Sequence, residues 1–319
     1  MEFLELKNNC GLKAVISTFG AGVKSLTLNG NHLILEVKDE KEYLNAPQLF
    51  GKTVARFIGR VNSHFILNGK ALNLKEDSDG ICLHGGYLEG LTFKDYSYRY
   101  GEDEDFSSLI LNVTSLDGEC GFPGNLNLEV TYKMKKNSNS FQICYKAISD
   151  KDTIISLSNH MYWNLNRDSD VSSYSLKINA SKCGKFKDSS LLIDGVMNVP
   201  SYLDFQVASN LGKKLDEIEK EIPDIYNLDH TFLFDKKINE ADITLANDKY
   251  KIECTSSFNA ANMFVNNNMN QVGMTNANLV GKKRVGIAIE PQQFPLNPYI
   301  LRKNEVYNQY IIYNISEIK

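Results

Sequence analysis

The amino-acid sequence predicts an all-β fold of mostly antiparallel strands, because apolar and polar residues alternate along several segments. In SFQICYKAIS, residues 140–149, the apolar side chains at positions 141, 143, 145 and 147 share one face, as on a half-buried strand. The same alternation recurs in residues 176–181, 250–256 and 306–315. Turn-forming sequences with glycine separate such runs, as in NGN at 29–31 and DGE at 117–119.

One segment, residues 209–223, has the periodicity of a helix. Its apolar residues are three or four positions apart and therefore share one helical face: Leu211, Leu215, Ile218 and Ile222. Ser209 can cap the N-terminus of this helix, and Pro223 marks its end. No long repeat and no linker rich in proline or serine interrupts the chain. We therefore expect residues 1–319 to form a single β domain with one or a few short helices.

The composition is that of a globular protein with a substantial core, since 42% of the 319 residues are hydrophobic and 23% are charged. The net charge of −4 offers no basic surface to phosphate groups or acidic lipids, so we expect neither a nucleic acid nor a membrane as a partner. The first residues lack the pattern of a signal peptide, and no apolar run approaches the length that crosses a bilayer. These features indicate a cytoplasmic protein.

The sequence contains no motif for a metal or a nucleotide cofactor. The six cysteines are scattered singly, without the spacing of zinc ligands, and they indicate reduced thiols. The dinucleotide-binding, P-loop, serine-hydrolase and zinc-protease motifs are all absent. We therefore expect no cofactor and no metal, and a function carried by side chains that the fold brings together.

Four short segments combine a titratable residue with glycine, asparagine or aromatic residues. They are CLHGG with His84, SNHMYWNLN with His160, NLDHTFLF with Asp229 and His230, and GIAIEPQQFP with Glu290. Each histidine and the aspartate, taken alone, fits a turn or a capping role at least as well as a catalytic one. Glu290 is the stronger candidate, because it follows the apolar run VGIAI. We expect its carboxylate at the end of a buried strand, in a partly desolvated place that suits a general base.

Together and in this order, these segments resemble the aldose 1-epimerase (galactose mutarotase) family. SLSNHMYWNL is similar to its N-H-x-[YF]-[FW]-N-L element, LDHTF to its D-H-x-F and IEPQQFP to its E-x-Q-x-x-P. LHGG and DGECGFPGN are similar to two further runs, and the resemblance extends over nearly the whole chain. It implies a single-domain β-supersandwich, which agrees with the alternation described above. It also implies an isomerase that interconverts the α and β anomers of a free aldohexose without a cofactor.

The resemblance also implies roles for individual residues. Glu290 matches the general base at the C1 hydroxyl, His160 the general acid at the ring oxygen, and His84 a second histidine that orients the sugar near these atoms. Asp229 matches a carboxylate that binds sugar hydroxyls. A structural role is the better interpretation of its neighbour His230.

Other residues of the matched segments are candidate substrate contacts: Arg60, Trp163 and Gln292. For Trp163 and its neighbour Tyr162, packing in the core is as good an interpretation as contact with the sugar.

The sequence departs from the family after Arg60. The family reads G-R-[VY]-x-N-R-I, and its second arginine binds substrate together with the preceding asparagine. Gly59 and Arg60 match the first G-R pair of this pattern, and GRVNSHFILNG contains no arginine after Arg60. Asn62 is then the candidate to replace the asparagine, and His64 or Arg56 the candidate to reach the vacant place. This interpretation predicts a more open pocket than is usual for the family.

Two other functions are compatible with the same motifs. A hexose-6-phosphate 1-epimerase would need several arginines for the phosphate, and the lost arginine argues mildly against it. A carbohydrate-binding protein without turnover would not need a matched acid and base. The motifs do not indicate which sugar is preferred, nor whether the protein is a monomer or an oligomer.

Overall fold

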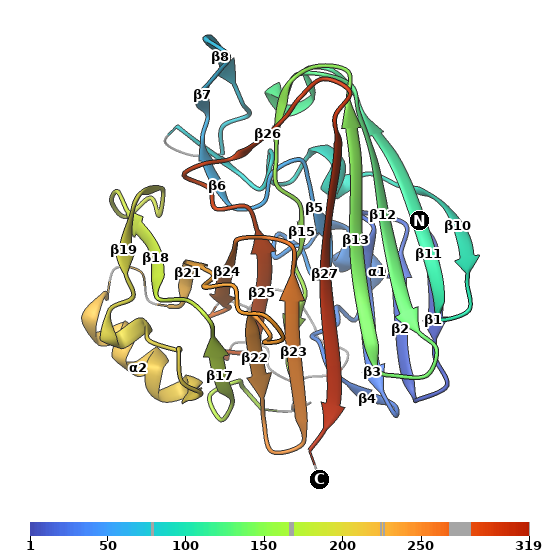
Figure 1. Cartoon of the computed structure of the whole chain (residues 1–319), viewed down its shortest axis with the longest axis vertical. Helices are drawn as coiled ribbons and strands as arrows, with labels where there is room; N and C mark the ends of the chain where they lie inside the picture. The colour runs from blue at the N-terminus through green and yellow to red at the C-terminus, as the bar shows by residue number, and fades with distance from the viewer. Residues whose placement is uncertain (78–79, 166–168, 224, 226, 268–281, 319) are drawn as a thin grey trace.

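The computed structural model describes residues 1–77, 80–165, 169–223, 225, 227–267 and 282–318. All pairs of named strands in these residues are antiparallel, so the predicted fold class is confirmed (Figure 1). None of the helices in this part of the chain has the length and apolar character needed to cross a lipid bilayer.

The largest sheet has nine strands and joins the two halves of the chain. Its C-terminal strand lies between a strand of each half, as the dark red arrow in Figure 1 shows. In spatial order the strands are β10 (Ser97–Glu102), β11 (Phe106–Ser115), β12 (Leu126–Lys135), β13 (Ser140–Ser149), β27 (Val306–Glu317), β23 (Tyr250–Ser256), β22 (Ile243–Ala246), β17 (Ser175–Ile178) and β20 (Ser209–Asn210).

A six-stranded sheet carries most of the site described below. Its order is β16 (Tyr162–Trp163), β25 (Ile287–Gln292), β24 (Ala260–Val265), β21 (Asp229–Leu233), β18 (Lys182–Phe186) and β19 (Ile193–Asn198). A four-stranded sheet near the N-terminus consists of β1 (Phe3–Lys7), β2 (Leu12–Ser17), β3 (Gly22–Leu28) and β4 (Asn31–His32). Four short pairs complete the strands: β5 (Thr53–Val54) with β15 (Ser158–Asn159), β6 (Arg60–Asn62) with β9 (Ile81–Leu83), β7 (His64–Leu67) with β8 (Lys70–Asn73), and β14 (Thr153–Ile155) with β26 (Tyr299–Leu301).

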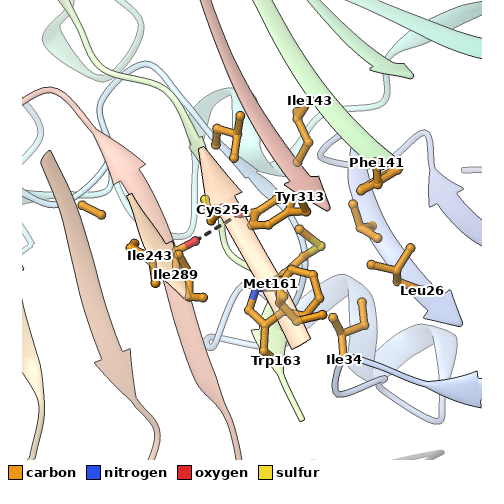
Figure 2. Close-up of a cluster of buried hydrophobic side chains, with 14 of the residues drawn as sticks. Leu26, Ile34, Phe141, Ile143, Met161, Trp163, Ile243, Cys254, Ile289 and Tyr313 are labelled. Carbon is orange, nitrogen blue, oxygen red and sulfur yellow. Dashed lines mark hydrogen bonds between the residues drawn. The ribbon is translucent and has the colours of Figure 1, made fainter. Parts of the chain in front are cut away.

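The three large sheets share one hydrophobic core (Figure 2). Leu26 of β3, Tyr313 of β27 and Ile289 of β25 all contribute side chains to it. The ring of Trp163 packs against that of Tyr313 with centroids 4.9 Å apart. The Tyr313 hydroxyl donates a hydrogen bond of 3.4 Å to the carbonyl of Ile289, which ties the nine-stranded sheet to the six-stranded sheet.

The alternation predicted for β13 and β23 is confirmed. On β13 the apolar residues at positions 141, 143, 145 and 147 are buried, whereas Lys146 between them is exposed. On β23, Tyr250, Ile252 and Cys254 are buried and the intervening residues are partly exposed. In each case one strand face lies on the core and the other faces outward, which is the physical origin of the period of two.

The predicted helix is α2, Leu211–Glu221, and its apolar face is buried as expected. It ends shortly before Pro223. Its cap differs from the prediction: the Asn210 side chain, not that of Ser209, accepts the hydrogen bond from the Lys213 backbone N–H, at 2.9 Å. A second short helix, α1 (Glu40–Asn45), is capped by Asp39. Three 3-10 turns occur in the described residues: η1 (Gly90–Phe93), η2 (Glu119–Gly121) and η3 (Ser201–Leu203).

Candidate active site

Three adjacent strands, β21, β24 and β25, form the polar floor of a cavity. Successive residues of a strand point to opposite faces, so Ile287 and Ile289 enter the core while Glu290 and Gln292 line the cavity. The pairing of the strands places Thr231, Asn262 and Glu290 in one row across the floor. Asp229 is the remaining polar residue of β21 on this face.

The cavity has a volume of about 400 Å³, within the range of small-molecule sites. His160, between β15 and β16, and His84, directly after β9, stand at its sides together with Arg60 of β6. Most of the remaining wall is apolar: Pro47, Leu49, Leu83, Tyr87, Tyr162, Phe186, Leu191, Ile193, Phe264 and Pro295. Gln48, Gly59 and Asn266 complete the lining.

His160 and Glu290 meet in this cavity, with Nε2 of the histidine 2.7 Å from Oε1 of the glutamate. Both side chains are nearly buried, 6% and 1% exposed. Pairing of β15 with β5 fixes the histidine backbone, which donates to the Lys52 carbonyl and accepts from the Gly51 N–H, each at 2.9 Å. The sequence predicted that Glu290 ends its strand. Glu290 instead lies within β25, because β25 continues to Gln292 while paired with β24.

Four buried polar atoms of the cavity-lining residues have no hydrogen-bond partner among the described residues. They are Oε1 of Gln48, Nδ1 of His160, Oε1 of Glu290 and Oε1 of Gln292. The Glu290 oxygen is close to the His160 ring, but it lies off the direction in which the ring N–H points. Because buried polar atoms are nearly always paired, this arrangement fits a ligand rich in hydroxyl groups.

Asp229 is held by two donors. Its Oδ2 lies 3.1 Å from the Arg60 guanidinium, and its Oδ1 accepts a hydrogen bond of 2.9 Å from Asn262. Burial alone would raise the pKa of this carboxyl. The Arg60 charge and the Asn262 hydrogen bond outweigh burial and hold the pKa below its usual range. Asp229 is therefore an ionised acceptor in the cavity.

The hydrogen bonds of His84 define its tautomer. Its Nδ1 accepts from the Gly59 backbone N–H at 3.2 Å, so the proton of the neutral ring is on Nε2. The ring packs edge-on against that of His160, with centroids 5.5 Å apart. Burial, together with the charges of His160 and Arg60, lowers the pKa of His84 well below its usual value. His84 is thus a neutral hydrogen-bond donor.

The expectation of a vacant arginine position is wrong, because Arg60 itself lines the cavity. Arg56 lies elsewhere and is 2% exposed. Its guanidinium donates to the Ser115 side chain and to four backbone carbonyls of residues 115–124. Matching Arg56 to the first arginine of the family pattern makes Arg60 the second one. Gly59 then stands where the family has asparagine.

Three predicted sugar contacts lie outside the cavity lining. Asn62 and His64 are exposed: Asn62 accepts from the His64 backbone N–H at 2.9 Å, and the His64 ring lies 3.1 Å from Asn73. Trp163 is buried in the core, because the two residues of β16 face opposite sides and Tyr162 takes the cavity side. The geometry does not support sugar contacts for these three residues.

His230 lies next to Asp229 in β21 and outside the cavity lining. It accepts a hydrogen bond of 3.3 Å from the Asp229 N–H, and its ring packs on Phe186 with centroids 4.9 Å apart. Burial lowers its pKa to about 4. These contacts agree with the structural interpretation of this residue.

Asn262 and Thr231 are cavity residues that the sequence interpretation missed. A signal was present for Asn262, since it is a single amide in the otherwise apolar run AANMFV. Thr231 occupies the variable position of the D-H-x-F element and gave none. In the described residues, no cluster of three or more histidine, cysteine, aspartate or glutamate side chains is arranged to hold a metal ion.

Comparisons with known proteins agree with this site and fold. The family model described as aldose 1-epimerase matches residues 2–314. Aldose 1-epimerase of Haemophilus influenzae is 29% identical over 314 residues, 93% of this chain and 88% of that protein. Galactose mutarotase of Sus scrofa is 24% identical over 317 residues, 93% and 89% of the two chains.

Among solved structures, galactose 1-epimerase of Lactobacillus acidophilus superimposes with a TM-score of 0.90 at 24% identity, covering 99% of this chain and 95% of that chain. An aldose epimerase homologue from C. elegans has a TM-score of 0.86 at 24% identity, covering 100% and 99%. These likenesses show a common fold. Because the family model spans nearly the whole sequence, the chain belongs to the aldose 1-epimerase family.

Proposed function

We propose that this protein is a mutarotase, which interconverts the α and β anomers of a free aldohexose by general acid and base catalysis. The observation that carries this proposal is the approach of Glu290 and His160 within one polar cavity. Ring opening needs a base at the C1 hydroxyl and an acid at the ring oxygen. Both oxygens are bonded to the same carbon, so the two catalytic groups must lie close together, as these two do.

The reaction runs in two symmetrical halves. The Glu290 carboxylate removes the proton of the C1 hydroxyl, the bond between C1 and the ring oxygen breaks, and protonated His160 gives its proton to that oxygen. Rotation about the C1–C2 bond then exposes the other face of the aldehyde. Ring closure returns the proton from the hydroxyl to His160 and the proton on Glu290 to the new C1 hydroxyl. Each proton transfer contributes about 10²–10⁴-fold to the rate.

The neighbouring residues bind and orient the sugar. The Nε2–H of neutral His84 donates to an oxygen near C1, which leaves His160 as the histidine that exchanges a proton. Asp229 accepts from sugar hydroxyls, and Arg60 both holds Asp229 and donates to the sugar. Proton transfer alone completes the reaction, so the mechanism needs no metal and no nucleotide.

The alternative of a phosphorylated substrate is not favoured by the charges of the cavity. Arg60 is the one arginine or lysine side chain among the described lining residues, and it is already paired with Asp229. Asp229 and Glu290 would both repel a phosphate. A binding protein without turnover has no need of the acid and base pair. The charges and the paired groups therefore favour catalysis on a free sugar.

The setting that fits this activity is the cytoplasm, with a small sugar as the partner. Support comes from the six cysteines, all of them free thiols, and from the net charge of −4, which suits neither nucleic acid nor an acidic membrane. The relatives named above are an aldose 1-epimerase and a galactose mutarotase, which points to glucose and galactose as the first sugars to test.

Polarimetry of freshly dissolved α-D-glucose and α-D-galactose tests the proposal. The wild-type protein should accelerate the approach to the equilibrium rotation, with full activity in the presence of a chelator. Glu290→Gln, which keeps the shape of the side chain, is the matched control and should abolish most of the acceleration. Equal rates with and without wild-type protein for every free aldose would overturn the proposed function, and a strict preference for glucose 6-phosphate would support the alternative.

A further inference from the structure

A chain of hydrogen bonds crosses the cavity floor with a fixed direction. Nδ2 of Asn262 donates to Oδ1 of Asp229 at 2.9 Å and to Oε2 of Glu290 at 3.3 Å. Ionised carboxylates only accept, so the NH2 group of the amide must face them. The Oδ1 atom of Asn262 therefore faces Thr231 and accepts a hydrogen bond of 3.1 Å from the Thr231 hydroxyl.

The same logic fixes the amide of Gln292. The Thr231 hydroxyl uses its single proton in the hydrogen bond that it donates to Asn262, so it can only accept a hydrogen bond from Gln292. Nε2 of Gln292 donates to it at 3.4 Å. The residue opposite Gln292 on β24 is Ala260, whose small side chain lets the longer one cross that strand. Oε1 of Gln292 consequently points away from Thr231.

Gln292 lines the cavity, and its Oε1 atom is buried without a hydrogen-bond partner among the described residues. Gln292 is 1% exposed, and no described residue donates a hydrogen bond to its Oε1. A Cβ placed on Gly59 would be only 3.1 Å from this oxygen. Gly59 has a φ of +81°, a backbone conformation that favours glycine. The Gln292 amide therefore packs against the side of Gly59 on which a Cβ would project.

We propose that Thr231 is a positioning residue that presents Oε1 of Gln292 to the sugar as a hydroxyl acceptor. Gln292 then selects aldoses that carry this hydroxyl over the corresponding deoxy sugars. Neither residue exchanges protons with C1 or the ring oxygen. The inference rests on the proposed function in one respect, that the ligand of the cavity is a free aldose.

Substitutions of the two residues separate this role from general packing. Thr231→Val keeps the shape but removes the hydroxyl, Thr231→Ser keeps the hydroxyl, and Gln292→Leu removes the acceptor. KM and kcat are measured for the best aldose and for its monodeoxy analogues. For wild type and Thr231→Ser, one analogue should have a KM at least about tenfold above that of the parent sugar. For Thr231→Val and Gln292→Leu that difference should disappear, while kcat for the parent changes by less than about threefold.

Two further measurements secure the result. The double variant Thr231→Val/Gln292→Leu should show the same KM ratio between the analogue and the parent sugar as either single variant, because both changes remove the same contact. In NMR spectra without sugar, the side-chain NH2 protons of Gln292 should exchange with solvent faster in Thr231→Val than in wild type or Thr231→Ser. If Thr231→Val does not fold, the kinetics of Gln292→Leu alone still test the inference.

Several results would overturn the inference. One is a Gln292→Leu variant that keeps the wild-type pattern across the analogues. Another is a rise in KM in Thr231→Val that is equal for the parent sugar and all analogues, which would indicate a structural role. A third is a fall in kcat at unchanged KM, which would indicate a role in the chemical step. Failure of the proposed function is a separate result: the wild type would not accelerate mutarotation, and calorimetric binding of the same analogues would still decide the role of Gln292.

Discussion

The imidazole of His160 and the carboxylate of Glu290 lie 2.7 Å apart although 130 positions separate them in the sequence. Pairing of β16 with β25 brings the two segments together. Glu290→Gln and His160→Asn should each lower kcat by at least about 10²-fold, because each variant loses one proton-transfer group. The measurement is polarimetry, with circular dichroism as the control for folding. A folded variant with near wild-type kcat would contradict the assigned roles.

The tautomer of His84 can be tested without any activity. Since burial and the nearby charges of His160 and Arg60 lower its pKa, the ring should remain neutral between about pH 5 and 8, where an ordinary histidine titrates. The expected ¹⁵N NMR signals are those of a protonated Nε2 and an accepting Nδ1, unchanged over this range. A titration of His84 near neutral pH would contradict the assignment. Because the folded-state pKa is below that of the unfolded chain, the stability contributed by neutral His84 should be lost as pH falls below about 6.5.

Arg60 and Arg56 should behave differently when each is replaced by methionine. Arg60→Met removes the donor beside Asp229 and should raise KM about tenfold or more with little change in thermal stability. Arg56→Met leaves several buried carbonyls without a donor and should lower the free energy of unfolding by about 2–5 kcal/mol. Kinetics and thermal unfolding of both variants provide the comparison. The opposite pattern would return the sugar-binding role to Arg56.

Asp229→Asn should act mainly on sugar binding. The variant keeps one acceptor oxygen but loses the charge, so KM should rise more than kcat falls. Since the pKa of Asp229 is held below its usual range, wild-type KM should not rise through protonation of this group until the pH is below about 4. Steady-state kinetics at several pH values measure both effects. A lower kcat at unchanged KM would place Asp229 in the chemical step instead.

The side chain of Lys52 is buried, and we expect its charged form to reduce the stability of the fold. Its ammonium group has no acidic partner in the described ion pairs and lies over Phe93 at 4.0 Å from the ring centroid. Burial lowers its pKa to about 7. Between about pH 7 and 10.4 the unfolded chain binds the proton more strongly than the folded one, so stability should rise with pH in this window.

Lys52→Met should therefore stabilise the protein by at least about 1 kcal/mol at pH 7, and the gain should shrink as the pH approaches 10.4. Urea unfolding at several pH values is the measurement. Lys135→Met, at an exposed position on β12, is the matched control and should show no such dependence. A gain that is constant over the whole range would mean that packing, and not the charge, is responsible.

Local patterns in the sequence predicted the fold class because a strand with one face on the core must alternate. The strands β13 and β23 show this directly. The order of strands within each sheet was not predictable, since nothing in the residues of β27 indicates that β13 and β23 are its neighbours. The same limit applies to the cap of α2, where serine and asparagine are adjacent and equally suitable.

Motifs that hold several residues at once allowed the sequence to locate three residues of the cavity, His160, Glu290 and Asp229. It failed where one motif can be matched in two registers. ARFIGRV contains two arginines four positions apart, and only the packing of Arg56 against residues 115–124 shows which of them is free to enter the cavity. For Tyr162 and Trp163, the sequence did not show which ring faces the cavity. Two adjacent residues of a strand face opposite sides, so only one of the two could do so.

Every residue of β25 is buried; β24 pairs with the whole strand, and β16 pairs with Ile287 and Ala288 on the other edge. Backbone groups in such a strand are exposed to solvent only when the surrounding structure opens as a whole. The Glu290 carboxylate is thus attached to a strand that we expect to open only together with its surroundings. Loss of activity on heating should coincide with loss of the entire β structure, so a simple rate assay can report the global melting of this protein.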